Sequence, residues 1–115
     1  MTAKTVLFEY LKREGIIQNI EKEQRKIAES QIELGHASDL HIRDSLIGTG
    51  TILKEDLTNH YYICSIKSGF LNNVLAYVII HRNDTQATIV GYAREGLINQ
   101  RAASKAVDRI QEQLK

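Results

Sequence analysis

The hydrophobic pattern of the chain changes its period near residue 50, and this change constrains the fold more than any motif does. Before residue 50, apolar side chains recur every three or four residues, as they do on one face of a helix. After residue 50, β-branched and aromatic residues become frequent, and the C-terminal segment then returns to a helical pattern. Helices on both sides of a run of strands indicate an α+β domain, with helices packed on a mostly antiparallel sheet.

Three helices are predicted in the first part of the chain. The first spans 4–15. The second spans 19–35, where Asn19 is suited to cap the N-terminus and apolar residues at seven-residue intervals form a narrow stripe. The members of this stripe are Ile20, Ile27 and Leu34. A third, short helix is expected from Ser38 or Asp39 to the glycines near residue 50.

The remaining segments predict a sheet followed by one more helix. Strands are expected at Thr51–Leu53, His60–Lys67, Val74–Arg82 and Gln86–Ala93, and an amphipathic helix at 97–114. The third of these strands is the most apolar, so we expect it to be central. Asn83-Asp84 favours a tight turn between the last two strands. The sequence therefore predicts one domain, 1–115, with N-terminal helices, a largely antiparallel sheet of three to four strands, and a C-terminal helix packed on it.

Composition excludes several classes of protein. The chain has 115 residues, 43% of them hydrophobic and 25% charged, which is typical of a globular domain. Its formal charge of +1 argues against non-specific coating of DNA, although it permits a local basic patch. Cys64 is the single cysteine, so no intramolecular disulfide can form. No apolar stretch is long enough for a membrane span, and we expect a soluble cytoplasmic protein without a membrane partner.

The strand predicted at 60–67 ends on an unusual charge. Alternate residues of a strand share a face. Tyr61, Ile63, Ser65 and Lys67 therefore point one way, and the other face, which is expected to pack on a core, is formed by Tyr62, Cys64, Ile66 and Ser68. The first set begins apolar and ends with a hydroxyl and an ammonium group. Two interpretations follow: the strand end reaches water and the lysine is solvated, or the lysine is held on the sheet for chemistry.

The surroundings of this lysine favour a specific comparison. Asp56 precedes a predicted turn, and the next strand carries Ser65-Ile66-Lys67. This order, with Gly91-Tyr92 before the last helix, resembles the PD-(D/E)XK nuclease superfamily over roughly residues 50–100. The resemblance implies a protein that binds or cleaves nucleic acid. It also implies that Asp56 binds Mg²⁺ and that Lys67 orients or deprotonates the attacking water.

One residue departs from the family pattern. Ser65 takes the place of the second acid of the catalytic set, and a neutral hydroxyl does not supply the missing carboxylate charge. Three explanations stay open: another acid such as Glu55 or Asp44 takes over, the protein is a catalytically dead relative, or there is no relationship. Mg²⁺ is expected only if the resemblance holds.

Other residues suggest weaker sites. Basic side chains that could form a nucleic-acid surface are Arg82, Arg94, Arg101 and Lys105, although acidic neighbours suit an ordinary mixed-charge surface as well. The four histidines have no zinc-site spacing. Besides the nuclease-like protein, two hypotheses therefore remain. One is a non-enzymatic protein-interaction module of regulatory or immunity type, dimeric through the helix at 19–35 or an edge strand. The other is a small-molecule binding domain with its pocket between sheet and helices.

Overall fold

The computed structural model describes residues 2–24, 26–34, 38–68, 74–94 and 101–114. These residues form five strands and four helices. In chain order the elements are α1 (Ala3–Arg13), α2 (Ile20–Glu23), β1 (Ile27–Glu33), α3 (Asp39–Thr49), β2 (Thr51–Asp56), β3 (Tyr61–Ser68), β4 (Val74–Asn83), β5 (Gln86–Ala93) and α4 (Ala102–Leu114). None of the described helices is long and apolar enough to cross a membrane.

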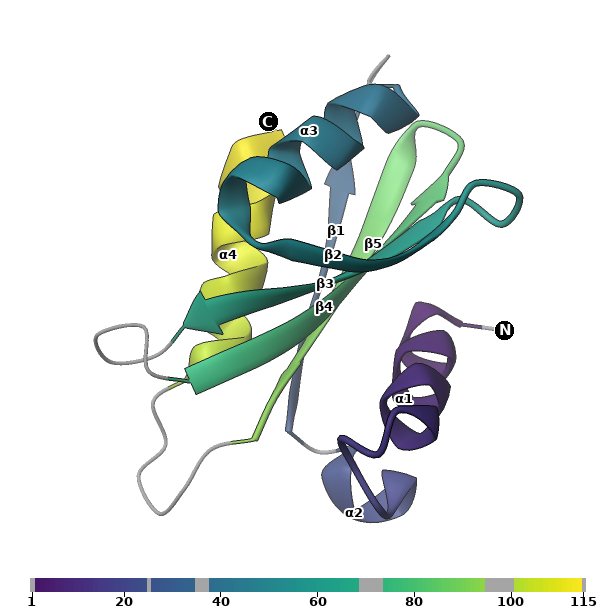
Figure 1. The fold of residues 1–115 in the computed structure, drawn as a ribbon. Helices are drawn as coiled ribbons and strands as arrows, with labels where there is room; N and C mark the ends of the chain where they lie inside the picture. The colour runs from purple at the N-terminus through teal and green to yellow at the C-terminus, as the bar shows by residue number, and fades with distance from the viewer. Residues whose placement is uncertain (1, 25, 35–37, 69–73, 95–100, 115) are drawn as a thin grey trace.

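The strands form one antiparallel sheet in the order β1-β5-β4-β3-β2 (Figure 1). Consecutive strands from β2 to β5 are neighbours, and β4 is the central strand, as its apolar sequence predicts. Asp84 adopts a left-handed conformation, with φ of 62°, in the turn between β4 and β5, which confirms the predicted hairpin. β1 joins the far side of β5, so β1 and β2 are the two edges.

The prediction of one long helix at 19–35 is wrong. Asn19 does cap a helix, because its side-chain oxygen accepts a hydrogen bond from the Lys22 backbone at 3.2 Å. That helix, α2, ends at Glu23, and the following residues form β1 instead. Pairing with β5 supplies β1 with backbone hydrogen bonds along its whole length, and this outweighs the helix propensity of its Glu and Gln residues. The sheet consequently has five strands instead of three to four, and the apolar stripe on a helix does not exist.

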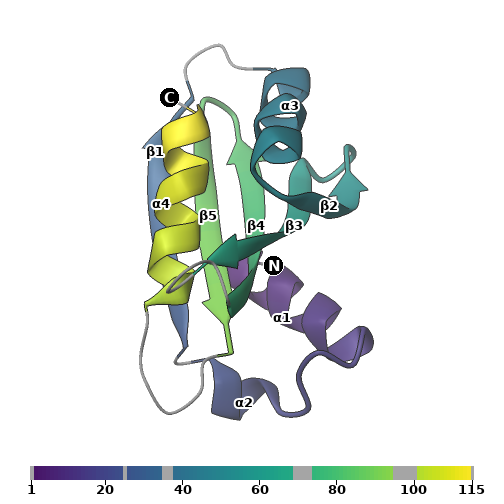
Figure 2. The same ribbon diagram turned by 60° about the vertical axis from the view of Figure 1, so that its left-hand side comes forward.

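The helices divide into two pairs, one on each side of the sheet (Figures 1 and 2). α3 and α4 pack on one face and on each other, and α1 packs on β4 and β5 from the other face, with α2 next to it. The predicted first, third and last helices are therefore present. α4 is described from Ala102, and the predicted start of that helix at 97–100 lies outside the described residues.

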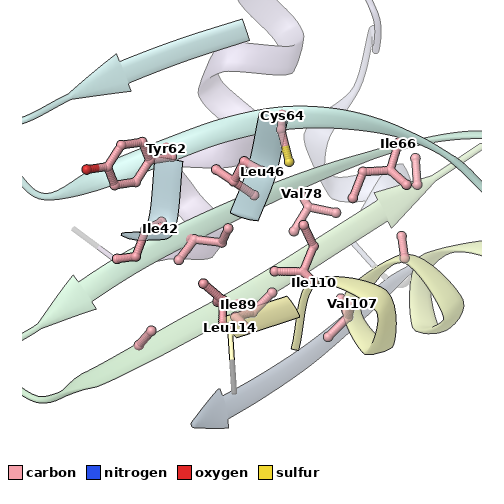
Figure 3. Packing of buried hydrophobic residues seen from close by; sticks show 14 of the residues in the cluster. Ile42, Leu46, Tyr62, Cys64, Ile66, Val78, Ile89, Val107, Ile110 and Leu114 are labelled. Carbon is pink, nitrogen blue, oxygen red and sulfur yellow. The ribbon is translucent and has the colours of Figure 1, made fainter. Parts of the chain in front are cut away.

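The face under α3 and α4 holds the larger apolar core (Figure 3). Tyr62, Cys64 and Ile66 of β3 point into it, as predicted, and meet Leu46 of α3 and Ile110 of α4. Burial raises the pKa of the Cys64 thiol to about 12, which leaves it protonated and unreactive near neutral pH. The opposite face holds a second core in which Leu7, Phe8 and Leu11 of α1 cover Ile79, Val90 and Tyr92.

Candidate binding cleft beneath α1

The structure separates the two residues on which the nuclease resemblance depends. Asp56 is paired with Tyr61 at the start of β3, whereas Lys67 lies six residues further along that strand. At about 3.3 Å per residue, their backbones are on the order of 20 Å apart. Groups that serve one metal-bound water must converge within hydrogen-bond reach. Asp56 and Lys67 are therefore not brought together as the resemblance requires.

The immediate contacts of Asp56 are structural. Its carboxylate accepts hydrogen bonds from the Asn59 backbone at 3.0 Å and from the Asn59 side chain at 2.9 Å, which closes the turn between β2 and β3. These hydrogen bonds lower the pKa of Asp56, with a smaller contribution from the charge of Lys54. Ser65 is half-buried near the middle of the sheet, opposite Thr51 and Tyr77.

Neither Glu55 nor Asp44, the two acids considered as substitutes, places its carboxylate beside that of Asp56. Glu55 points to the opposite face, where its Oε1 is 3.1 Å from Nε of Arg43, and Asp44 belongs to α3 on that same opposite side. Within the described ranges, no group of three or more His, Cys, Asp or Glu side chains is placed to hold a metal ion. Among the described residues, Asp56 therefore has no neighbouring carboxylates with which a Mg²⁺ site of this kind is built.

Gly91 and Tyr92 have structural explanations as well. A Cβ at Gly91 would lie 2.7 Å from Cγ2 of Val107 and 3.1 Å from the Ala103 carbonyl oxygen, so glycine allows α4 to approach β5 closely. Tyr92 points to the other face, where its ring meets Phe8 edge-on at 5.6 Å. Its hydroxyl donates to the buried Glu23 carboxylate at 3.0 Å.

The predicted basic surface is divided between the two ends of the sheet. Arg82 pairs with Ala87 at the β4–β5 turn, and its Nη1 lies 3.7 Å from Oδ1 of Asp39. Arg94 follows the last residue of β5, on the order of 20 Å away along that strand. Arg101 and Lys105 are adjacent at the start of α4, where the Lys105 amide donates to the Arg101 carbonyl oxygen at 3.0 Å. Arg82 is therefore not part of one surface with the other three.

The structure instead brings together a set of residues between α1 and the β2–β3 side of the sheet. α1 lies over β4 and β5, and beside it is a cleft of about 320 Å³. One wall is a stripe of α1, and the floor comes from β2, β3, β4 and the β2–β3 turn. The lining residues are Ala3, Val6, Glu9, Tyr10, Arg13, Lys54, Asn59, Tyr61, Ile79 and His81.

A β-bulge directs Lys54 into this cleft. The register of β2 against β3 shifts between Ile52, which lies opposite Cys64, and Lys54, which lies opposite Ile63. Without the shift, Lys54 would share the face of Ile52, because residues two apart in a regular strand point the same way. With the shift, Nζ of Lys54 lies 5.8 Å from the centre of the Tyr61 ring.

Positive charge and aromatic surface meet in the cleft. Partial burial, joined by the negative charge of Glu14, raises the pKa of Tyr10, and the positive charge of Lys54 opposes that rise. Among the described residues, no carboxylate lies within 4.0 Å of the charged nitrogens of Lys54 or Arg13. Glu9 is the one acidic residue among the described lining residues, against Arg13, Lys54 and the imidazole of His81. The cleft therefore combines aromatic and aliphatic surface with the cationic groups of Lys54 and Arg13, which have no carboxylate within 4.0 Å among the described residues.

Sequence reasoning missed this site because its residues come from four separate elements. Tyr10 belongs to the predicted first helix and Tyr61 to the apolar start of its predicted strand, but neither position shows what lies across from it. Lys54 lies beyond the predicted end of its strand, and the bulge that aims it has no marker such as glycine. A pocket formed by tertiary packing leaves no local signature in the sequence.

Comparisons with known proteins give little further guidance. No protein-family model matches the chain, and no curated protein sequence matches it. Among solved structures, it is similar to a TBP-like protein from Parabacteroides distasonis, with a TM-score of 0.41 and 14% sequence identity. That match covers 65% of this chain and 60% of the other. A likeness at this level carries no argument about function.

Proposed function

We propose that this chain is a non-enzymatic binding protein and that the cleft beneath α1 holds a small amphipathic anion. The observation that carries the proposal is the β-bulge, which turns the Lys54 ammonium group toward the cleft and over Tyr61. A buried or half-buried cation without a carboxylate partner is a favourable site for an anionic ligand, because the ligand supplies the missing charge.

The lining residues suggest the chemistry of the ligand. The half-buried side chains of Val6 and Tyr10 and the edge of the largely buried Tyr61 offer apolar contact, while Arg13 stands at the wall and Lys54 at the floor. A volume of about 320 Å³ is near the lower limit for ligand pockets, which suits a compact molecule. An aromatic ring carrying one carboxylate or sulfonate fits this combination, since the ring contacts the tyrosines and the acid group meets the cations.

A binding role is also favoured over the nuclease hypothesis by the placement of the residues that nuclease chemistry would need. Asp56 closes a turn and Lys67 lies far along β3. Among the described lining residues, no nucleophile contacts a base, so their arrangement is suited to holding a ligand and not to transforming it.

The proposal can be tested with anilinonaphthalene sulfonate, an aromatic anion whose fluorescence rises in apolar sites. We expect saturable binding to the folded protein, and Lys54→Met should weaken it about tenfold, because a charge-assisted contact is lost. Lys67→Met is the matched control, since Lys67 is on the same face of the sheet but outside the cleft. Near-ultraviolet circular dichroism verifies that each variant is folded, because partly folded chains also bind this dye.

Two further measurements define failure. Filling the cleft with Val6→Trp should abolish binding, and benzyltrimethylammonium, an aromatic cation of similar size, should not compete. The proposal is wrong if Lys54→Met and Lys67→Met bind the dye equally well, or if the cation competes as well as an aromatic carboxylate does.

A further inference from the structure

The two edges of the sheet differ in how they are protected. β2 carries a bulge and ends in Lys54-Glu55-Asp56, and both features discourage pairing with another strand. β1 has no bulge, because its pairing with β5 runs without a shift from Ile27 to Glu33, and its two charged residues, Glu29 and Glu33, alternate with uncharged ones. β1 forms the margin of the sheet next to α4 (Figure 2). No described element lies along its outer side.

β1 is complementary to itself. In an antiparallel pair, residues that face each other must lie on the same side of the sheet, so a two-fold axis through the pair must pass by a residue. When it passes by Ser30, the middle residue, all seven residues of β1 are paired; every shifted register pairs fewer. Glu29 then lies opposite Gln31 of the second copy, where a carboxylate accepts from an amide.

The same register also joins apolar side chains. Ala28 lies opposite Ile32 of the second copy, on the face of α4. Both residues are partly buried and already pack against the larger core, so the pairing extends that core across the edge. Moving the axis to Glu29 would place two glutamates opposite each other, and moving it to Gln31 would place Glu29 opposite Glu33. Like charges directly opposite are destabilising, so the charges favour the Ser30 register.

We infer that a second copy of this chain pairs with β1 about a two-fold axis at Ser30, which joins two five-stranded sheets into one continuous sheet. This surface is separate from the cleft beneath α1, so it stands or fails independently of the ligand. The partner is recognised through backbone hydrogen bonds along the edge, and the paired side chains set the register.

Cross-linking tests the register directly. Opposite residues in an antiparallel pair have Cα atoms about 4.5–5.5 Å apart, which is within the range of a disulfide. Ser30→Cys, in a Cys64→Ala background, should therefore form a covalent dimer under mild oxidation. Thr51→Cys, on the β2 edge, is the matched control and should form far less. Equal cross-linking of the two variants, or none at Ser30→Cys, overturns the inference.

Charge changes at Gln31 test the same contact without cross-linking, in case oxidation perturbs the fold. Sedimentation of the wild-type chain over a range of concentrations should show a monomer–dimer equilibrium. Gln31→Lys places an ammonium opposite Glu29 twice and should tighten the dimer about fivefold, while Gln31→Glu should weaken it by about the same factor. A chain that is monomeric throughout, or a dimer that responds to neither variant, contradicts the inference.

Discussion

The two faces of the sheet are formed by the same strands but are covered to different extents. On the face under α3 and α4, two helices cover the strands, and the contacts are almost entirely apolar. On the other face, α1 covers β4 and β5 and leaves a cleft over the β2–β3 side. Alternate residues of β3 show the contrast: Tyr62, Cys64 and Ile66 are buried, while Ser65 and Lys67 become progressively more exposed. One face is thus covered by two helices, whereas the other contains an open cleft.

The largest expected effects come from removing apolar side chains on each face. Leu7 of α1 and Leu46 of α3 are both completely buried. We expect Leu7→Ala and Leu46→Ala each to lower the free energy of unfolding by about 2–5 kcal/mol, measured by urea denaturation. Similar losses and single transitions would mean that both faces belong to one cooperative unit. If Leu7→Ala instead gave two transitions, α1 would be a separately melting cover, and the second core would not stabilise the sheet.

A medium effect is expected where α4 approaches the sheet. Gly91→Ala should cost about 1–3 kcal/mol in urea unfolding, because the new methyl group overlaps Val107 and the α4 backbone. Gly48→Ala is the matched control: it lies in α3 with nothing within 4 Å of a new Cβ, and should be neutral or stabilising. If Gly91→Ala were as harmless as Gly48→Ala, the closed face would be less tightly packed than the structure indicates.

Much of this arrangement is readable from the sequence where local preferences decide it. α1, α3, the four later strands and the β4–β5 turn follow from periodicity, caps and turn residues. β1 does not, because Ala28, Ile32 and Leu34 fit a two-residue period as well as a helical one, and only pairing with β5 decides between them.

The separation of Asp56 and Lys67 can be predicted from the sequence, but only when the pairing register of the two strands is worked out. A turn at residues 57–60 pairs Asp56 with Tyr61, and each further residue of β3 then moves away from Asp56. Ser65 is the partner of Thr51, the first residue of β2. Lys67 therefore lies beyond the end of β2 that is furthest from Asp56. The cleft could not be predicted from the sequence. The bulge at Leu53 turns Lys54 to the other face of the sheet, and the position of this bulge depends on tertiary packing.

The smallest expected effect concerns the buried polar contact that joins α2 to the sheet on the face covered by α1. Glu23 of α2 is buried on that side, where it accepts from the Tyr92 hydroxyl at 3.0 Å and lies 3.2 Å from Nζ of Lys26. Burial alone would raise the pKa of Glu23, but the hydrogen bonds from Tyr92 and Lys26 and the nearby positive charges outweigh it, and the net pKa is lowered. Glu23→Gln keeps the shape and removes the charge. We expect it to lower the free energy of unfolding by about 1 kcal/mol at neutral pH.

The pH dependence of this loss identifies its cause. Because the pKa of Glu23 is lower in the folded than in the unfolded state, its charge stabilises the fold fully above the ordinary carboxyl range, and this contribution disappears as the pH falls through the folded value. The difference between wild type and Glu23→Gln should therefore shrink on acidification, whereas the exposed Glu21→Gln, the matched control in α2, should differ little at any pH. A difference that stays constant into acid would mean that Glu23 acts through packing alone, and the open face would then be held, like the closed one, without help from charge.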